Sequence, residues 1–339
     1  MNFEWQLALR YFKGQRKGSR FLSFIKVMAI TGVAIGSAGL LIALSIVHGF
    51  KSTINNKILE FAPHVTVGTF SGDELSRADT LLSHIERYPD VEAAQAVVTG
   101  ETMIQSNDFV TGTLLKGVAA EGDITELRNY INRGNYDLTA DSVGRPGIML
   151  GAQLARTLQA DIGSKITAYT VDGIPSPLNS PEIQQFRLTG VYQTGIDRFD
   201  EVFAIVDRQH AGRLFKMDET EASAIEVKAG NTTAIEELDS EISADMGYPI
   251  YSESIYERYG NIFAWVDLQE QTIPLVIGAM IIVAAFNLIG TVLMMVLERT
   301  RDIGILKTMG ARSGKIRTVF MLEGFLVAAV GLLIGIALS

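Results

Sequence analysis

The sequence predicts an α-helical membrane protein with a large inserted α/β (α+β) domain. Two runs without a formal charge, Val27 to Val47 and Ile273 to Leu297, contain 21 and 25 residues. At 1.5 Å per residue each run can cross a hydrocarbon core of about 30 Å. Val319 to Leu338 is a third such run, interrupted only by Glu323. Three runs with charged flanks favour spanning helices over buried helices of a soluble protein.

The distribution of Lys and Arg predicts the orientation. Residues 1–26 contain six of them and residues 298–317 contain six more, so both segments are expected in the cytoplasm. The region between the first two spans, with 17 basic and 34 acidic residues, carries about −17 and is expected outside. Such an acidic domain argues against a nucleic-acid partner. The first run is longer than a signal-peptide core and no small-residue cleavage site closes it, which predicts a retained helix.

These boundaries divide the chain into six segments. We expect a cytoplasmic N-terminal segment at 1–20, spanning helices at 21–50, 271–297 and 316–339, an external domain at 51–270, and a cytoplasmic helix at 298–315. The first spanning helix carries Gly32, Gly36 and Gly39, which would let another helix approach closely. At about 45 Å it is longer than the membrane requires, so we expect it to continue into the external space.

The external region contains two separated strand, helix, strand patterns. We expect strands at 63–67 and 91–98 around a helix at 74–88, and strands at 224–228 and 248–251 around a helix at 232–246. A hairpin over 101–118 turns at residues 106–108. These patterns predict one α/β subdomain made from residues 51–118 and 219–270.

Residues 119–218 are expected to form a second, β-rich subdomain. Its predicted elements are a helix near 124–132 and strands near 165–171, 186–192 and 201–206. Between two of these strands, Gly173 to Pro181 contains three of the eight prolines of the chain. Because proline removes a backbone donor and fixes φ, this segment should project as a stiff loop. It is either an ordinary surface connection or a docking element.

No catalytic or metal site is indicated by the sequence. The four histidines lack metal-ligand spacing, and neither a phosphate-binding G-x-x-x-x-G-K-[S/T] loop nor a G-x-S-x-G motif occurs. The chain contains no cysteine, which excludes disulfides and thiolate metal sites. We therefore predict a non-catalytic protein that binds no cofactor itself and draws energy from another chain.

The charged segment from Glu298 to Arg312 is the strongest candidate for a partner-binding site. Asp302 near its start and Lys307 near its end match the helix dipole, and Gly310 is a plausible stop. Ile303, Leu306 and Met309 or Gly310 would form an exposed apolar stripe framed by Arg299, Arg301 and Lys307. Such a helix fits a groove on a soluble partner, or else lies on the lipid headgroups.

Two polar residues lie within the spans. Asn287 is placed in mid-membrane, where an interhelical hydrogen bond is expected to satisfy its amide. Glu323 lies one or two turns into the third span near Arg317, and can extend toward the interface or a partner; we interpret it as structural.

Several motifs together carry a family resemblance. Val283 to Arg312, V-A-A-F-N-L-I-G-T-V-L-M-M-V-L-E-R-T-R-D-I-G-I-L-K-T-M-G-A-R, resembles the permease signature of the FtsX/MacB superfamily. The remaining motifs are similar to the lipoprotein-releasing (LolC/LolE) permeases: L-A-L-R-Y-F near the N-terminus, L-S-I-V-H-G-F at 44–50, A-P-H-V-T-V at 62–67, P-G-I-M-L-G at 146–151 and F-R-L-T-G-V-Y-Q-T-G at 186–195. The resemblance covers nearly the whole chain.

The resemblance implies a permease subunit of an inner-membrane ABC transporter that releases lipoproteins to a periplasmic carrier. ATP and Mg would be bound by a separate cytoplasmic ATPase, and a second permease subunit would complete a homo- or heterodimer. The external region would be a periplasmic MacB-like domain with Porter-like and Sabre-like subdomains. The implied coupling residues are Glu298, Arg299, Arg301, Asp302, Ile303, Leu306, Lys307 and Gly310. The implied carrier-binding hook contains Ile174, Pro175, Pro177 and Pro181, and the implied lipoprotein contacts are Ile46, Val47 and Phe50.

Two alternative functions remain open, and the sequence differs from the family in one respect. MacB-like export of peptides or drugs would require an ATPase that MacB carries on its own chain, and an FtsX-like regulator of a cell-wall hydrolase usually has a smaller external domain. The family has four spans, whereas this sequence ends at Ser339 in or just after the third. We expect that the last helix is missing from the sequence.

Overall fold

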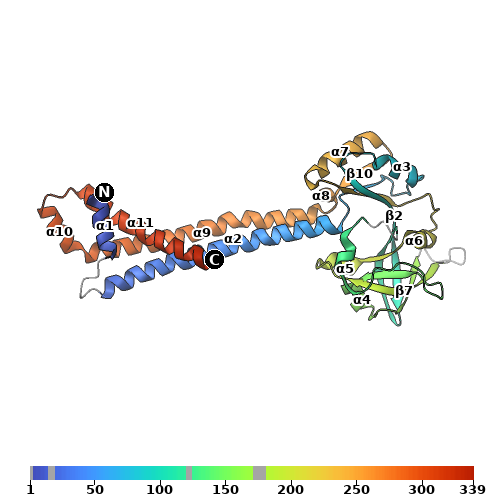
Figure 1. The fold of residues 1–339 in the computed structure, drawn as a ribbon, viewed down its shortest axis with the longest axis horizontal. Helices are drawn as coiled ribbons and strands as arrows, with labels where there is room; N and C mark the ends of the chain where they lie inside the picture. The colour runs from blue at the N-terminus through green and yellow to red at the C-terminus, as the bar shows by residue number, and fades with distance from the viewer. Residues whose placement is uncertain (1–2, 14–19, 120–123, 171–180) are drawn as a thin grey trace. The chain divides into compact units, whose positions relative to one another are not determined.

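The computed structural model describes residues 3–13, 20–119, 124–170 and 181–339 (Figure 1). The chain divides into two compact units, and each is described by itself. The first unit comprises residues 1–53 and 264–339, and the second comprises residues 54–263. The second unit lies within the segment 51–270, for which the sequence predicts an external domain.

The first unit is helical. Its elements are α1 (Phe3–Lys13), α2 (Arg20–Phe61), α9 (Gly260–Glu298), α10 (Thr300–Thr308) and α11 (Ser313–Leu338). Among the described residues, three helices are long and apolar enough to cross a membrane: Ser23–Phe61, Gly260–Glu298 and Ser313–Leu338. Both α2 and α9 continue past the expected ends of their spans into the second unit, where Phe61 and Phe263 join its hydrophobic core.

Small residues let the spanning helices approach closely. A Cβ added at Gly32 of α2 would overlap the Asn287 amide of α9, so this amide packs closely against a glycine of another helix. On α11, a Cβ at Gly331 would meet Val33 and one at Gly335 would meet Ser37, both on α2. Among the residues that the structure describes, nothing lies within 4 Å of such a Cβ at Gly36 or Gly39. The close approach predicted for the first span therefore occurs at Gly32 but not at its other two glycines.

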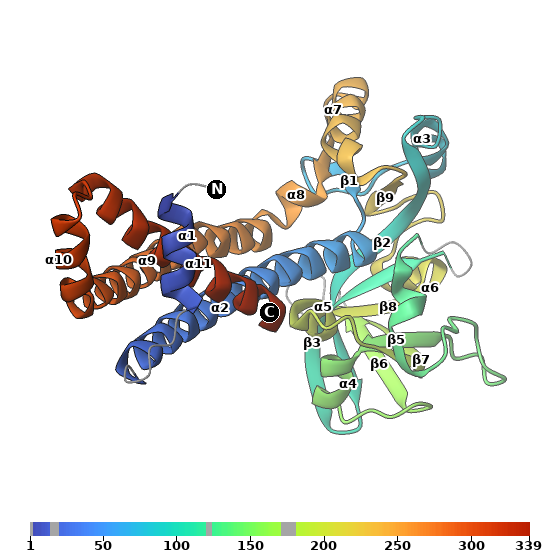
Figure 2. The same ribbon diagram turned by 60° about the vertical axis from the view of Figure 1, so that its left-hand side comes forward.

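The second unit is built on one continuous sheet. The strand order is β10-β1-β9-β2-β3-β8-β5-β7-β4, with β6 between β2 and β7 (Figures 1 and 2). The strands are β1 (Val65–Thr69), β2 (Val91–Ser106), β3 (Phe109–Val118), β4 (Ile131–Gly134), β5 (Gly147–Gly151), β6 (Lys165–Thr170), β7 (Glu182–Tyr192), β8 (Phe203–Asp207), β9 (Ala224–Ala229) and β10 (Ile250–Ser254).

Short helices connect and cover these strands. They are α3 (Ala78–Ile85), η1 (Glu126–Tyr130), α4 (Ala152–Thr157), α5 (Asp197–Val202), α6 (Arg208–Phe215), η2 (Thr232–Ala234), α7 (Ile235–Met246) and α8 (Ile255–Arg258). The helix expected near 124–132 is a single 3₁₀ turn followed by strand β4, and the helix expected over 74–88 spans only Ala78–Ile85.

Strand β2 belongs to two halves of this unit. Its first part, Val91 to Val97, pairs with β9 in an α/β half that also contains β1, β10, α3 and α7. Its second part, Val98 to Ser106, pairs with β3 and β6, and β2, β3, β8, β5, β7 and β6 close into a barrel. We predicted a strand break between 98 and 101 and placed residues 101–118 in the α/β subdomain. The structure shows one strand there, and its second half and β3 are barrel strands.

Two hydrophobic cores lie on opposite sides of the barrel wall. One fills the barrel, with Ile104, Leu115, Phe186 and Leu188 fully buried. The other lies between the barrel exterior and the α/β half, and includes Phe61 from the end of α2. Consecutive residues Val97 and Val98 of β2 belong to different cores because successive side chains of a strand point to opposite faces.

His64 ties the end of α2 to the sheet. Its buried ring lies 3.0 Å from the Leu59 oxygen through Nε2, and the Ala229 backbone N–H donates to Nδ1 at 3.0 Å. Because Nδ1 accepts, the proton of the neutral ring is on Nε2 and is donated to Leu59. Burial is the main reason why the pKa of His64 lies below its usual value, since desolvation disfavours the imidazolium.

His64 predicts a loss of stability in mild acid. Its lowered pKa means that the unfolded chain binds the proton more tightly, so the contribution of the neutral ring is complete above about pH 6.5 and falls as the pH drops toward the folded-state pKa, by at most about 1.4 kcal/mol per pH unit. We expect the unfolding temperature of the full chain in detergent to drop more between pH 7.5 and 5.5 for the wild type than for His64→Gln. His48→Gln, an exposed site, is the control. Equal drops for the wild type and His64→Gln would contradict this account.

Candidate functional site

The segment between α9 and α11 forms a short helix with two different sides. α10 begins after Arg299, ends at Thr308 and is followed by Gly310 at φ 86°, a conformation that glycine adopts without strain. Ile305 and Met309 are 51% and 79% exposed, and they lie on the same side as the exposed Arg301. The spacing of four residues places these three side chains above one another. We call Arg301, Ile305 and Met309 the outer face of α10.

The predicted stripe lies partly on the other side. Ile303 and Leu306 are half-buried, and Ile303 lines a crevice with Val292 of α9 and Phe320 of α11. The exposed apolar residues of this segment are therefore Ile305 and Met309 rather than Ile303 and Leu306. Of the other predicted coupling residues, Glu298, Lys307 and Gly310 are exposed and Asp302 is half-buried.

Arg299 faces its own protein rather than framing an exposed stripe. Its Nη1 lies 3.3 Å from the Asp302 carboxylate, and its guanidinium stacks 4.1 Å from the centre of the Tyr11 ring of α1. A guanidinium over an aromatic face is attracted by the ring quadrupole. Arg299 thus joins the beginning of α10 to α1, a contact between residues almost three hundred positions apart.

A buried ion pair lies close to this contact. Lys26 Nζ of α2 is 2.8 Å from Glu323 Oε1 of α11, and the Glu323 side chain is 0% exposed. The same ammonium donates to the backbone oxygen of Tyr11 at 2.6 Å. Glu323 is structural, as the sequence predicted, but its partner is Lys26 and its side chain does not reach the surface. Tyr11 and Lys26 therefore connect α1, α2, α10 and α11.

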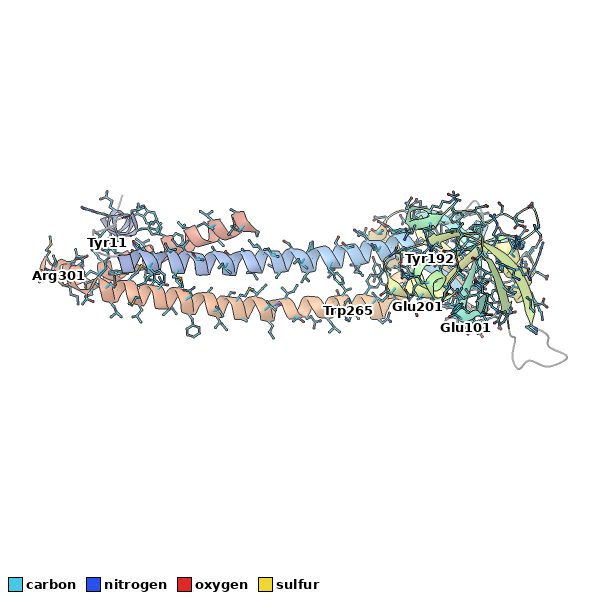
Figure 3. The ribbon with its side chains drawn as sticks, turned by 90° about the horizontal axis from the view of Figure 1, so that it is seen from below. Tyr11, Glu101, Tyr192, Glu201, Trp265 and Arg301 are labelled. Carbon is cyan, nitrogen blue, oxygen red and sulfur yellow. The ribbon has the colours of Figure 1, made fainter. Side chains whose placement is uncertain are left out.

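A groove lies between α2 and α9 at the other end of the first unit. Its volume is about 570 Å³, and apolar side chains from both helices dominate its lining: Leu40, Ala43, Leu44, Val47, Trp265, Leu268, Thr272, Ile273, Val276 and Ile277. Figure 3 shows Trp265 near the start of α9, far from Arg301, which lies on α10 beyond the other end of α9.

The three predicted lipoprotein contacts do not share one surface. Val47 lines the groove, and Phe50 packs edge-on against Trp265 with ring centres 6.1 Å apart. Ile46 is 65% exposed and does not line the groove. Lys51 and Asp267 pair at 3.3 Å beyond Phe50 and Trp265, so a charged pair borders the aromatic contact. Trp265 was not singled out in the sequence, although tryptophan is typical of membrane interfaces.

The predicted hook lies mostly outside the described residues. This applies to Ile174, Pro175 and Pro177, whereas Pro181 is described and exposed immediately before β7. Within the described ranges, no group of three or more His, Cys, Asp or Glu residues could hold a metal ion.

Comparison with known proteins identifies the family. A model of the MacB-like periplasmic core domain matches residues 27–245, and a model of the FtsX-like permease C-terminal region matches residues 274–339. The LolC transmembrane protein of the lipoprotein-releasing system of Neisseria meningitidis serogroup B is 27% identical over 99% of this chain and 80% of that protein. The chain belongs to the LolC/LolE family of FtsX-like permeases. It is an ABC transporter permease subunit, an inner-membrane protein with a periplasmic domain.

Further members of the LolC/LolE family resemble the chain over its full length. The LolE protein of Haemophilus influenzae is 22% identical over 100% of this chain and 82% of that protein. Among solved structures, the periplasmic region of MacB from Actinobacillus actinomycetemcomitans aligns with a TM-score of 0.40 and 9% identity, over 58% of this chain and 91% of that one.

The Lys26–Glu323 pair generates a stability prediction. Lys26→Met leaves Glu323 as an uncompensated buried charge, which typically costs about 3–5 kcal/mol. We expect a marked fall in the unfolding temperature in detergent, and a recovery in Lys26→Met/Glu323→Met, where neither charge remains. The pair Lys315–Glu4, at 3.5 Å with Lys315 exposed and Glu4 half-buried, is the control, because Lys315→Met should cost no more than about 1 kcal/mol. A Lys26→Met variant as stable as the control would contradict this account.

Proposed function

We propose that this LolC/LolE-family permease transmits ATP-driven motion from a separate cytoplasmic ATPase to its periplasmic domain, and thereby releases lipoproteins from the inner membrane to a periplasmic carrier. The observation that carries the proposal is the outer face of α10, where Ile305 and Met309 are the exposed apolar residues beside a basic residue. An exposed aliphatic pair on a short, charged helix fits a groove on a soluble partner. In this proposal α10 is cytoplasmic, as the Lys and Arg distribution predicts.

The inner side of α10 supports the same role. Arg299 and Ile303 connect the helix to α1, α9 and α11, so a partner that displaces α10 also displaces the helices behind it. A helix lying passively on lipid would place its apolar side in the membrane, whereas here apolar residues occupy both the inner and the outer sides. ATP and Mg are assigned to the partner ATPase, and a second permease subunit completes the transporter.

The groove between α2 and α9 is the proposed contact for the lipid part of the cargo. It is long, apolar and bordered by Phe50 and Trp265, features that suit an acyl chain. Transfer of such a chain into water costs about 0.8 kcal/mol per CH₂, so release requires both an energy source and a carrier that shields the chain. Residues 174–181 are assigned to the carrier-binding hook, and unimpaired transfer to the carrier after their deletion would refute that assignment.

The outer face of α10 predicts which substitutions uncouple the ATPase. Ile305→Asp/Met309→Asp would bury two unpaired carboxylates at the interface, so we expect at least a tenfold weaker ATPase interaction, equivalent to about 1.4 kcal/mol or more. Co-purification and ATP-dependent lipoprotein release measure this effect. Ser313→Asp adds a charge at the exposed start of α11 and should leave both unchanged. Full ATPase recovery with the double variant would exclude this face as the docking site.

The groove predicts a difference between neighbouring residues. A photoreactive phenylalanine derivative at Val47 should crosslink to a lipoprotein several-fold more than the same group at Ile46, because only Val47 lines the groove. Addition of the ATPase and ATP should reduce the Val47 crosslink as cargo leaves. Crosslinking at Ile46 but not at Val47 would place the lipid on another surface.

A further inference from the structure

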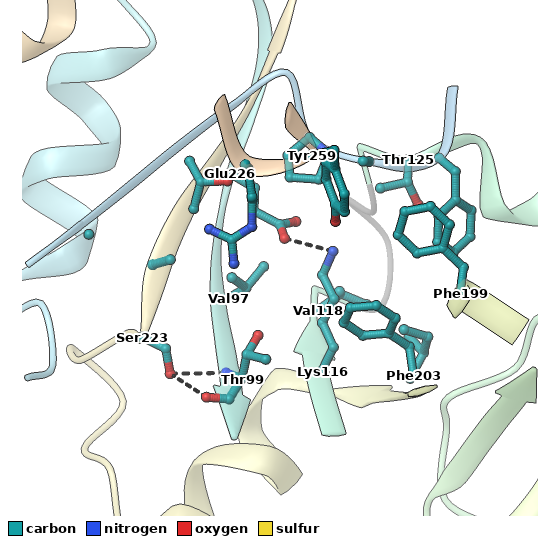
Figure 4. A pocket seen from close by; sticks show the side chains of 18 of the residues that line it. Val97, Thr99, Lys116, Val118, Thr125, Phe199, Phe203, Ser223, Glu226 and Tyr259 are labelled. Atoms are coloured by element: carbon teal, nitrogen blue, oxygen red, sulfur yellow. Dashed lines mark hydrogen bonds and ion pairs between the residues drawn. The ribbon is translucent and has the colours of Figure 1, made fainter. Parts of the chain in front are cut away.

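A cleft lies where the barrel meets the α/β half of the second unit. Its volume is about 280 Å³, and Figure 4 shows residues of both halves around it. Val118 and Phe203 come from barrel strands β3 and β8, and Glu226 comes from β9 of the α/β half. Tyr259, at the beginning of the segment that leads into α9, also lines the cleft. The proposed coupling and lipid sites use none of these residues.

One ion pair crosses the cleft. Lys116 Nζ on β3 lies 2.7 Å from Glu226 Oε1 on β9, and the two side chains are only 12% and 9% exposed. Figure 4 shows this contact as a dashed line between the two walls. Gln95 Nε2 on β2 donates to the other oxygen of Glu226 at 2.9 Å. The pair thus connects the barrel and the α/β half directly, independently of the backbone.

The position of the pair matches the point where β2 changes partners. Glu226 stands opposite Gln95 in the ladder between β2 and β9, and Lys116 stands opposite Thr99 in the ladder between β2 and β3. The first ladder ends at Val97 and the second begins at Val98. The ion pair therefore lies on one face of the sheet at the Val97–Val98 junction. It connects β3 and β9, the two strands that lie on either side of β2.

The same region receives the ends of the two long helices. The Phe199 ring of α5 lies 4.7 Å from the Phe61 ring of α2 and 5.5 Å from the Tyr259 ring. Burial is the main cause of the raised pKa of Tyr259, and the charges of Lys116 and Glu226 act on the same hydroxyl in opposite directions, which places it near the pair. Phe199 itself is held by Tyr192, whose hydroxyl donates to the Phe203 oxygen at 2.8 Å and to the Phe199 oxygen at 3.3 Å.

The chemistry of the pair indicates a geometric role. A buried ion pair can often be replaced by apolar residues without loss of stability, because desolvation offsets the attraction between the charges. The close contact of 2.7 Å between its charged groups forms only in a narrow range of wall positions, so the pair favours one arrangement of its two walls over others. An apolar pair at the same place would tolerate sliding and rotation, since hydrophobic contact is not directional.

We propose that Lys116 and Glu226 are positioning residues that set the angle between the barrel and the α/β half at the Val97–Val98 junction of β2, and that this angle changes during transport. The proposal rests on the proposed function in one respect: the change is driven by α2, whose Phe61 lines the cleft, and by α9, which begins directly after the cleft residue Tyr259. The two charges form a latch that holds one angle until displacement of the helix ends pulls it apart.

The test uses the full chain with its ATPase in nanodiscs. Since the sequence contains no cysteine, spin labels on Asp108→Cys in the β2–β3 turn and Glu237→Cys on α7 report the distance between the two halves. Both sites are exposed. The latch is removed in Lys116→Met/Glu226→Met. The matched control, Arg133→Met/Asp161→Met, removes a pair of 3.1 Å that lies within the barrel half.

We expect a narrow distance distribution in the wild type and the control that shifts when ATP is added. Lys116→Met/Glu226→Met should fold and bind the ATPase, with a modest fall in unfolding temperature because the buried Gln95 amide loses its acceptor, but show a broad distance distribution and several-fold less lipoprotein released per ATP hydrolysed. A narrow, wild-type distribution in this variant would overturn the proposal. If the methionine variant does not fold, Lys116→Glu/Glu226→Lys decides: a restored narrow distribution supports the latch, and a folded protein with a broad one refutes it.

The two proposals fail separately in this experiment. The distance measurement needs no lipoprotein, so an angle that depends on the ion pair can be established even if the cargo belongs to another class. Conversely, normal release by the methionine variant together with a broadened distribution would show that the latch sets the angle but that transport does not use it, which would overturn the second half of the proposal alone.

Discussion

The second unit depends on one strand that takes part in two hydrogen-bond ladders. β2 pairs with β9 up to Val97 and with β3 from Val98, so the α/β half and the barrel share a backbone as well as a boundary. Because side chains alternate along a strand, adjacent valines of β2 enter different cores. Neither half can be removed without exposing the edge of the other, which accounts for the fact that both are parts of one compact unit.

In the first unit, α1 has a comparable linking role. It is short and amphipathic and includes no spanning segment, yet Tyr11 contacts Arg299 at the beginning of α10 and its backbone oxygen accepts from Lys26 on α2. Tyr11 and Phe320 of α11 also lie with their rings 6.4 Å apart. The small helix thus joins the helices on either side of α10 at one place, so the α10 segment is braced by residues from the opposite end of the chain.

The sequence was sufficient for features that depend on local composition. Charge-free length predicted the spans, and turn chemistry at Ser106, Asn107 and Asp108 placed the hairpin correctly, with Asn107 at φ 51°. Prediction from the sequence failed where several local patterns were equally compatible with the same residues. Two overlapping apolar faces are possible on α10, formed by Ile303, Ile305, Leu306 and Met309. Only the packing of α9 and α11 determines which of these faces is covered. Likewise, the sequence predicted a strand that ends at residue 98 and a hairpin that begins at residue 101, but the ladder with β3 runs without interruption from Val98 to Ser106.

Pairings between distant residues could not be predicted from the sequence for another reason: the local spacing of residues carries no information about contacts between distant segments. The Lys26–Glu323 contact has an implication for how the protein is made, because these residues are separated by most of the chain. When α2 leaves the ribosome, the carboxylate that will neutralise its lysine has not yet been synthesised. Until α11 inserts, Lys26 must keep its ammonium in water or among lipid headgroups. Burial of Lys26 is therefore tied to the insertion of α11, and a nascent chain halted before Glu323 lacks the carboxylate that pairs with Lys26.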